Sequence, residues 1–207
     1  MTTSNGATPS IREALPEDAA DVASVHVLSW RAAYRDLLPG PYLASLDPEE
    51  RASVWHDRLT APDRPTVLLA TEPDGRVVAF SCLRAWPDEE PAEAEAAGAT
   101  DVARTAGAVG TAGASRAFDP VSTAELAALY ALPEAWGTGV GRSLLAASTE
   151  VLVTAGFRTA ALWVLAGNTR GRRFYEAAGW RPDGTAVREV TGGRELEELR
   201  YRRALFG

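Results

Sequence analysis

The sequence predicts one domain of the α+β or α/β class, in which helices cover both faces of a mixed β-sheet. The main observation is the order of strand-like and helix-like segments, which runs β-α-α-β-β-β-α-β-α-β-β along the chain. The length of 207 residues fits one domain, or one domain with an insertion. Hydrophobic residues make up 46% of the chain, which is enough to bury a core without covalent cross-links.

The N-terminal half of the chain predicts a strand, two helices and a β-hairpin. An alternation of apolar and polar residues at 11–15 is typical of a short strand. A proline followed by two acids favours a helix start, and we expect one helix over 17–38 and a second over 48–59. Apolar residues at 66–70 and 76–83 flank a Glu-Pro-Asp-Gly turn, which predicts a hairpin.

Two segments are expected to lie outside the packed core. We predict that residues 1–9 are a disordered N-terminus and that residues 10–207 form the single domain. Residues 85–118 contain 12 alanines and 4 glycines, and their acids cluster towards one end. This composition predicts an exposed insertion, partly disordered or locally helical. A lid over a functional site is the alternative, since long loops in compact domains often have that role.

The C-terminal half returns to regular structure after Pro120. A glycine ends each of its two predicted helices, as a left-handed helix cap would. The strand between these helices is strongly apolar, which is typical of a buried strand. The expected elements are a strand at 124–132, a helix at 137–155, a strand at 159–165, a helix at 169–178 and a hairpin of 186–190 with 195–201.

Composition excludes several classes of protein. The net charge of −7 argues against a general nucleic-acid binder. All 21 basic residues are arginines, so no mechanism that needs a lysine amine is available. His26 and His56 are the only histidines, which excludes a His-rich metal site, and we expect no metal.

The sequence predicts a cytoplasmic protein without a membrane segment. No apolar run approaches the ~20 residues that span a bilayer. The first ten residues are polar and lack the basic and apolar parts of a secretory signal. Cys82 is the single cysteine, so an intrachain disulfide is impossible and a reducing compartment is expected. The final hairpin could pair across a homodimer.

The segment from Tyr130 to Leu145 carries the first chemical signal. It predicts a strand, a glycine-rich turn and a helix in close succession. Glycines let a ligand approach the backbone closely, and free N–H groups at a helix start favour an anion. The spacing of Gly137, Gly139 and Gly141 fits neither a Rossmann fingerprint nor a P-loop. A tight strand–helix connection without a ligand is the alternative for this turn alone.

A second motif follows the next predicted strand. Asn168 precedes the pair Phe174-Tyr175, and a Gly-Trp pair closes the helix. Together with the glycine-rich turn and the Ala-Leu-Pro sequence before it, these residues resemble the acetyl-CoA core of the GNAT superfamily of N-acetyltransferases. The resemblance is close over residues 124–181 and looser over residues 10–83.

The resemblance implies both a fold and an activity. The fold would be the GNAT acyl-CoA fold, a three-layer α+β domain with a mostly antiparallel, seven-stranded central sheet. The activity would be transfer of an acetyl group from acetyl-CoA, the co-substrate, to an amine by direct attack in a ternary complex. The partner would be a small-molecule or peptide amine. A non-catalytic acyl-CoA-binding sensor or interaction module on the same fold is one alternative. A nucleotide-binding enzyme of another class is a second; it predicts affinity for ATP or NAD, which the mismatch of the glycine motif disfavours.

The same resemblance implies a set of cofactor-binding residues. The turn amides would bind the pyrophosphate, and the end of the preceding strand would hold the pantetheine arm where that strand parts from its neighbour. Ordinary core packing is an equal alternative for Tyr130, and Asn168 is also a good N-cap for the following helix. One departure is Trp136, which stands where the family often has arginine or glutamine. The implied residues are Tyr130, Ala131, Leu132, Gly137, Thr138, Gly139, Val140, Gly141, Arg142, Asn168 and Phe174.

Two residues are implied to be catalytic. Tyr175 matches the family's usual general acid, because a phenol can protonate the departing thiolate of CoA. A half-buried core tyrosine is the alternative. Glu125 would deprotonate the acceptor amine, directly or through water, since an ammonium is not a nucleophile. For Glu125 the alternative is an exposed acid at a strand end.

His26, Trp30 and Tyr34 recur every four residues and therefore share one face of the first predicted helix. The resemblance implies that this face helps to form the acceptor pocket, which makes the three residues candidates for substrate binding. Helix packing with polar tips at the rim is the alternative. The arginines of the last predicted helix, Arg170, Arg172 and Arg173, are expected to form a solvated face. Contact with the adenosine phosphate of CoA is the alternative for them.

Overall fold

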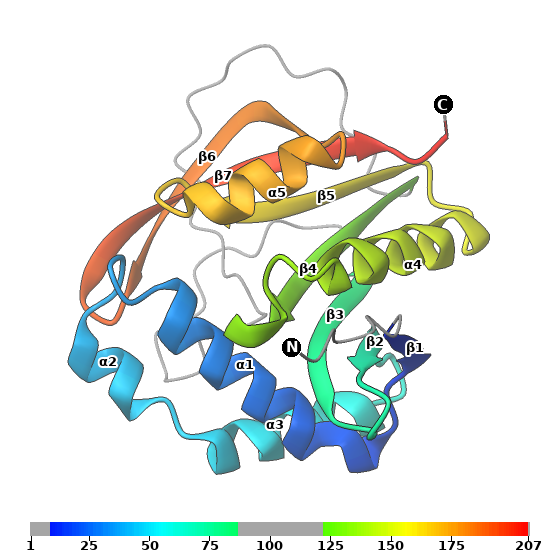
Figure 1. Cartoon of the computed structure of the whole chain (residues 1–207). Coiled ribbons are helices and arrows are strands. Elements are labelled where there is room, and N and C mark those ends of the chain that lie inside the picture. The colour runs from blue at the N-terminus through cyan, green and yellow to red at the C-terminus, as the bar shows by residue number, and fades with distance from the viewer. Residues whose placement is uncertain (1–8, 87–121, 207) are drawn as a thin grey trace, which may run out of the picture.

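The computed structural model describes residues 9–86 and 122–206 (Figure 1). The predicted disordered N-terminus, except Pro9, and nearly all of the predicted insertion fall outside these ranges. The described residues form a seven-stranded sheet with helices on both faces, which confirms the predicted fold class. Within the described ranges, none of the helices is long and apolar enough to cross a membrane.

The sheet has the strand order β1-β2-β3-β4-β5-β7-β6. Only β4 and β5 pair in parallel, and the other neighbours pair antiparallel. The last strand, β7, lies between β5 and β6, so the C-terminal hairpin continues the sheet beyond β5. The strands are Ser10–Glu13 (β1), Thr66–Thr71 (β2), Val77–Ala85 (β3), Thr123–Ala131 (β4), Thr159–Leu165 (β5), Arg181–Thr191 (β6) and Arg194–Ala204 (β7).

Helices pack on opposite faces of the sheet because successive strand residues point to opposite sides. On β3, the Phe80 ring lies 5.8 Å from the His26 ring of α1 and 5.1 Å from the Trp55 ring of α3. The next residue, Ser81, places its Oγ 2.8 Å from Ser148 Oγ of α4. The helices are Ala19–Ala33 (α1), Gly40–Ser45 (α2), Pro48–Thr60 (α3), Val140–Thr154 (α4) and Thr169–Ala177 (α5), with short 3-10 turns at Pro16–Asp18 (η1) and Pro133–Ala135 (η3).

Two predicted helix boundaries were wrong. The first long helix was expected to run to residue 38, but α1 ends at Ala33 and a separate helix, α2, begins at Gly40. The Pro-Gly-Pro sequence that was interpreted as a break also starts a helix, because proline is tolerated in the first helical turn. The helix expected from residue 137 begins at Val140, since Gly137 and Gly139 have φ angles of +78° and +98°.

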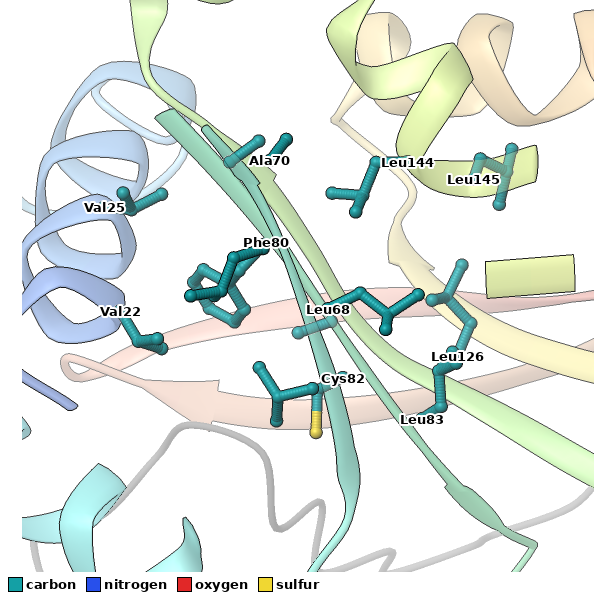
Figure 2. Packing of buried hydrophobic residues seen from close by; sticks show 14 of the residues in the cluster. Val22, Val25, Leu68, Ala70, Phe80, Cys82, Leu83, Leu126, Leu144 and Leu145 are labelled. Atoms are coloured by element: carbon teal, nitrogen blue, oxygen red, sulfur yellow. The ribbon is translucent and has the colours of Figure 1, made fainter. Parts of the chain in front are cut away.

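The main core lies on both sides of β2, β3 and β4 (Figure 2). In Figure 2, Val22 and Val25 of α1 approach the sheet from one side, and Leu144 and Leu145 of α4 approach it from the other. All four side chains are at most 3% exposed. Full burial of one such side chain stabilises a fold by about 1.5–3 kcal/mol. The two helix layers are therefore held against the strands that lead to the glycine-rich turn.

The sheet opens between β4 and β5. These strands pair only over Thr123–Glu125 and Thr159–Ala161, although they continue to Ala131 and Leu165 respectively. Figure 1 shows the two strands diverging beyond the paired segment. The later parts of both strands therefore face a gap with backbone N–H and C=O groups that do not bond across it.

Buried Cys82 provides a test of the core. Burial raises the pKa of the Cys82 thiol from 9.0 to about 12. Between these values the unfolded chain has lost the thiol proton while the folded chain keeps it. The free energy of unfolding that Cys82 contributes therefore falls as pH rises through this range. Urea unfolding at about pH 8 and about pH 11 measures how far the free energy of unfolding of the parent exceeds that of Cys82→Ala. This difference should be smaller at the higher pH. A difference that is the same at both pH values would contradict burial of the thiol.

Candidate functional site

A cavity of about 400 Å³ opens where β4 and β5 separate. Its walls come from α1, the second half of β4, the glycine-rich turn, β5, the start of α5 and the β6–β7 hairpin. Segments that are distant in the sequence thus meet at one place, and that place is the gap in the sheet. The fold therefore leaves an opening in the sheet next to the two sequence motifs.

Most of the predicted site residues line this cavity. They are Trp30, Tyr34, Glu125, Tyr130, Ala131, Gly137, Gly139, Gly141, Arg142, Asn168, Phe174 and Tyr175. Four predicted residues lie outside the lining. Leu132 and Val140 are buried in the main core, and Thr138 Oγ1 donates to the Ala135 carbonyl at 2.8 Å. His26, the fourth, is only 1% exposed and lies behind Tyr130.

The glycine-rich turn presents backbone donors to the cavity. Among the described residues, the amides of Gly137, Gly139 and Gly141 find no hydrogen-bond acceptor. A Cβ atom at Gly137 or Gly139 would have no neighbour within 4 Å, so the space in front of both residues is open. The turn leads directly into α4, whose N-terminal dipole favours an anion. This geometry fits a phosphate group.

Arg142 contributes to the turn through its side chain. Its amide donates to the Gly139 carbonyl at 3.0 Å, as part of the first turn of α4, and is therefore engaged by the protein itself. The side chain lines the cavity. A guanidinium there adds charge-assisted donors to the backbone amides.

Asn168 caps α5. Its Oδ1 atom accepts a hydrogen bond from the Gly171 amide at 2.9 Å, which is the N-cap that its residue type predicts. Phe174, in the second turn of α5, packs close to α4: a Cβ atom at Gly141 would lie 3.6 Å from the Phe174 ring. The two helices that border the cavity therefore approach each other at Gly141 and Phe174.

Tyr175 is buried and yet reaches the cavity. Its side chain is 9% exposed, and its ring lies 5.2 Å from the Phe174 ring and 6.0 Å from the Trp180 ring. Burial raises the pKa of the Tyr175 phenol well above its usual value, because the phenolate would lose its hydration. The residue is therefore both a core tyrosine and a phenol that keeps its proton at neutral pH.

Glu125 is the last residue of β4 that pairs with β5. The alternative of an exposed strand-end acid is wrong, because the residue is only 3% exposed. Its Oε2 atom accepts a 2.6 Å hydrogen bond from Nε of Arg84, the residue opposite it on β3. The arginine offsets the cost of burying the carboxylate. This pair was not predicted, since it depends on a register shift between Cys82 and Leu83.

A cluster of aromatic side chains forms the wall of the cavity on the α1 side. Tyr130 stacks on His26, with 5.1 Å between ring centroids and 16° between planes. Trp55 Nε1 donates to His26 Nδ1 at 3.1 Å, so the imidazole is held from behind. Trp30 meets the Tyr130 ring edge-on at 6.3 Å, and Tyr34 meets the Trp30 ring at 5.0 Å. His26 thus supports the wall, whereas Trp30 and Tyr34 are part of it.

Several lining residues were missed in the sequence. They come from β5 and from the C-terminal hairpin, and they are Trp163, Glu189, Thr191, Leu196 and Glu198. The hairpin itself was predicted, but its position beside β5 depends on β7 entering between β5 and β6. Arg172, expected on a solvated face, instead donates from Nε to Tyr201 Oη at 3.1 Å and from Nη1 to the Ala166 carbonyl at 3.2 Å.

Comparison with known proteins decides the family. A model of the acetyltransferase (GNAT) family matches residues 28–180. The chain belongs to this GNAT family. It is 31% identical over 159 residues to the uncharacterized N-acetyltransferase YuaI of Bacillus subtilis, and the match covers 77% of this chain and 73% of that protein.

Solved structures share the GNAT fold with this chain. One is the Paia N-acetyltransferase of Thermoplasma acidophilum in complex with coenzyme A, with a TM-score of 0.61, 19% identity and coverage of 96% of this chain and 99% of that chain. Another is the phosphinothricin acetyltransferase of Sinorhizobium meliloti in complex with acetyl-CoA. Its TM-score is 0.62 at 18% identity, with coverage of 96% of this chain and 89% of that chain. At these identities the likeness is one of fold.

The residues of the cavity fit the GNAT co-substrate. The open space before Gly137 and Gly139 suits a phosphate, and the unpaired edges of β4 and β5 suit an extended chain with amide groups. In the part of the chain that the structure describes, no group of three or more His, Cys, Asp or Glu side chains is placed to hold a metal ion.

The left-handed backbone at Gly139 is expected to exclude a side chain. Gly139→Ala should destabilise the fold by about 1–2 kcal/mol, because an L-residue is strained at a φ of +98°. Gly141→Ala is the matched control, since a Cβ there would make only an ordinary 3.6 Å contact with Phe174. Urea unfolding of both variants tests the turn. Equal urea midpoints for Gly139→Ala and Gly141→Ala would contradict the left-handed backbone at Gly139.

Proposed function

We propose that this chain is an acetyl-CoA-dependent N-acetyltransferase that acts by direct attack of an amine on the thioester in a ternary complex. The observation that carries the proposal is the meeting of three features in one cavity. These are the free amides of the glycine-rich turn, the protonated phenol of Tyr175 and the buried carboxylate of Glu125. Bound acetyl-CoA supplies the thioester carbonyl that the amine attacks.

The glycine-rich turn binds and orients the co-substrate. The amides of Gly137, Gly139 and Gly141, with the side chain of Arg142, hold the pyrophosphate. The edge of β4 at Tyr130 and Ala131 pairs with the pantetheine arm, because β5 does not pair with β4 there. The cap uses Oδ1 of Asn168, which leaves the Nδ2 group of that amide to donate towards pantetheine.

Two side chains move protons. Tyr175 Oη holds a proton for the departing sulfur, since the buried phenol is protonated across the neutral range. Glu125 accepts a proton from the amine, directly or through water, while Arg84 fixes the orientation of the carboxylate. The acceptor amine enters along the wall formed by Trp30 and Tyr34, on the side of the cavity bordered by α1.

Replacing Tyr175 tests the general acid. Tyr175→Phe should lower kcat by about 100-fold to 10,000-fold, the usual contribution of a positioned proton donor, and leave the Kd for CoA unchanged. The assay follows thiol release from acetyl-CoA with a panel of amines and peptides. Tyr201→Phe is the control, because Tyr201 is buried but lies outside the cavity lining. Undiminished turnover by Tyr175→Phe would refute its catalytic role.

Replacing Glu125 tests the base through the pH dependence of the reaction. Glu125→Gln should slow acetylation most near neutral pH, where the acceptor is protonated. The deficit should close as pH rises towards the amine's own pKa, since the amine then arrives deprotonated. Glu134→Gln removes an exposed carboxylate that pairs with Arg76 and serves as the control. A deficit that stays constant with pH would assign Glu125 a structural role instead.

A further inference from the structure

Arg170 and Trp136 form a stacked pair next to the glycine-rich turn. The guanidinium carbon of Arg170 lies 4.1 Å from the centre of the Trp136 ring. The ring is itself fixed, because Trp136 Nε1 donates to the carbonyl of Ala131, the last residue of β4, at 2.9 Å. Both residues line the cavity, as does Gly137. The pair connects the start of α5 to the glycine-rich turn.

The position of Arg170 is electrostatically unusual. It lies in the first turn of α5, where the positive end of the helix dipole repels a cation, and that turn contains no acid. The first turn of α4 has the same character, with Arg142 and no acid. Two positive helix ends and two arginines thus border the same cavity. These positive charges together favour binding of a ligand with more than one negative charge.

Stacking leaves the hydrogen-bonding groups of Arg170 available. The indole covers the flat face of the guanidinium, whereas the N–H donors point outwards in its plane. A cation held in this way loses little further freedom when it binds a phosphate, so the pair pre-organises the arginine. Trp136 occupies the position before the first motif glycine, where the sequence has no basic side chain of its own.

We propose that Arg170 binds the pyrophosphate of CoA and that Trp136 is the positioning residue that holds it there. The guanidinium of Arg170, on α5, supplies the positive charge that the residue before Gly137 lacks. This inference rests on the proposed use of CoA by the same cavity. Arg170 is exposed, as the sequence indicated, and the inference gives this exposed arginine a binding role.

Calorimetric titration of the full chain with CoA tests the binding role of Arg170. Arg170→Met should weaken CoA binding about tenfold or more, the usual effect of losing a charge-assisted hydrogen bond. The loss should be the same with dephospho-CoA, which keeps the pyrophosphate, and absent with pantetheine, which has no phosphate. Arg173→Met, on the same helix but outside the cavity lining, should bind like the parent.

A double-mutant cycle tests the role of Trp136. Trp136→Leu should weaken CoA binding, and Trp136→Leu combined with Arg170→Met should be no weaker than Arg170→Met alone, because both changes remove one interaction. Trp136→Phe keeps an aromatic face and should recover part of the affinity. Thermal unfolding without ligand confirms that each variant is folded.

Several outcomes would overturn the inference. Three results would each refute binding of the pyrophosphate by Arg170. The Arg170→Met variant could bind CoA as tightly as the parent does. It could lose as much affinity for pantetheine as for CoA, or it could lose affinity for CoA and none for dephospho-CoA. Additive losses in the cycle would refute the positioning role of Trp136. A parent chain that binds no CoA would instead refute the proposed function itself, so the two failures are distinguishable.

Discussion

The separation of β4 from β5 is the feature on which the candidate site depends. Parallel pairing stops at Glu125 and Ala161, and from there the sheet has an internal edge. An unpaired edge inside a sheet costs free energy unless another group takes up its N–H and C=O groups. The α1 and α4 layers hold β4 on one side of the gap, and β7 holds β5 on the other. The opening is therefore built into the fold.

The cavity lining combines two kinds of group. The glycine-rich turn, Arg142 and the Arg170–Trp136 pair favour an anion. Trp30, Tyr34 and Glu125 offer aromatic surface and a carboxylate. Tyr175 lines the same cavity. A ligand that carries both phosphates and a reactive group suits this arrangement.

Local sequence patterns predicted the parts of the site that depend on local geometry. The glycines at 137, 139 and 141 indicated a turn before a helix, and Asn168 indicated a cap, because both features involve neighbouring residues. The Arg84–Glu125 pair could not be predicted, since it requires cross-strand register. The residues from β6 and β7 were missed for the same reason, because strand order is a property of the whole sheet. His26 lies behind the wall because its place depends on Tyr130 and Trp55, which come from other elements.

Thermal unfolding with acetyl-CoA, and in parallel with ATP and NAD, tests the central claim most directly. A ligand at about 100 times its Kd stabilises the folded state by about 2.7 kcal/mol, which for a chain of this size raises Tm by roughly 5–10 °C. The account predicts that shift with acetyl-CoA and none with ATP or NAD at the same concentration. An unchanged Tm with millimolar acetyl-CoA would contradict the assignment of the cavity.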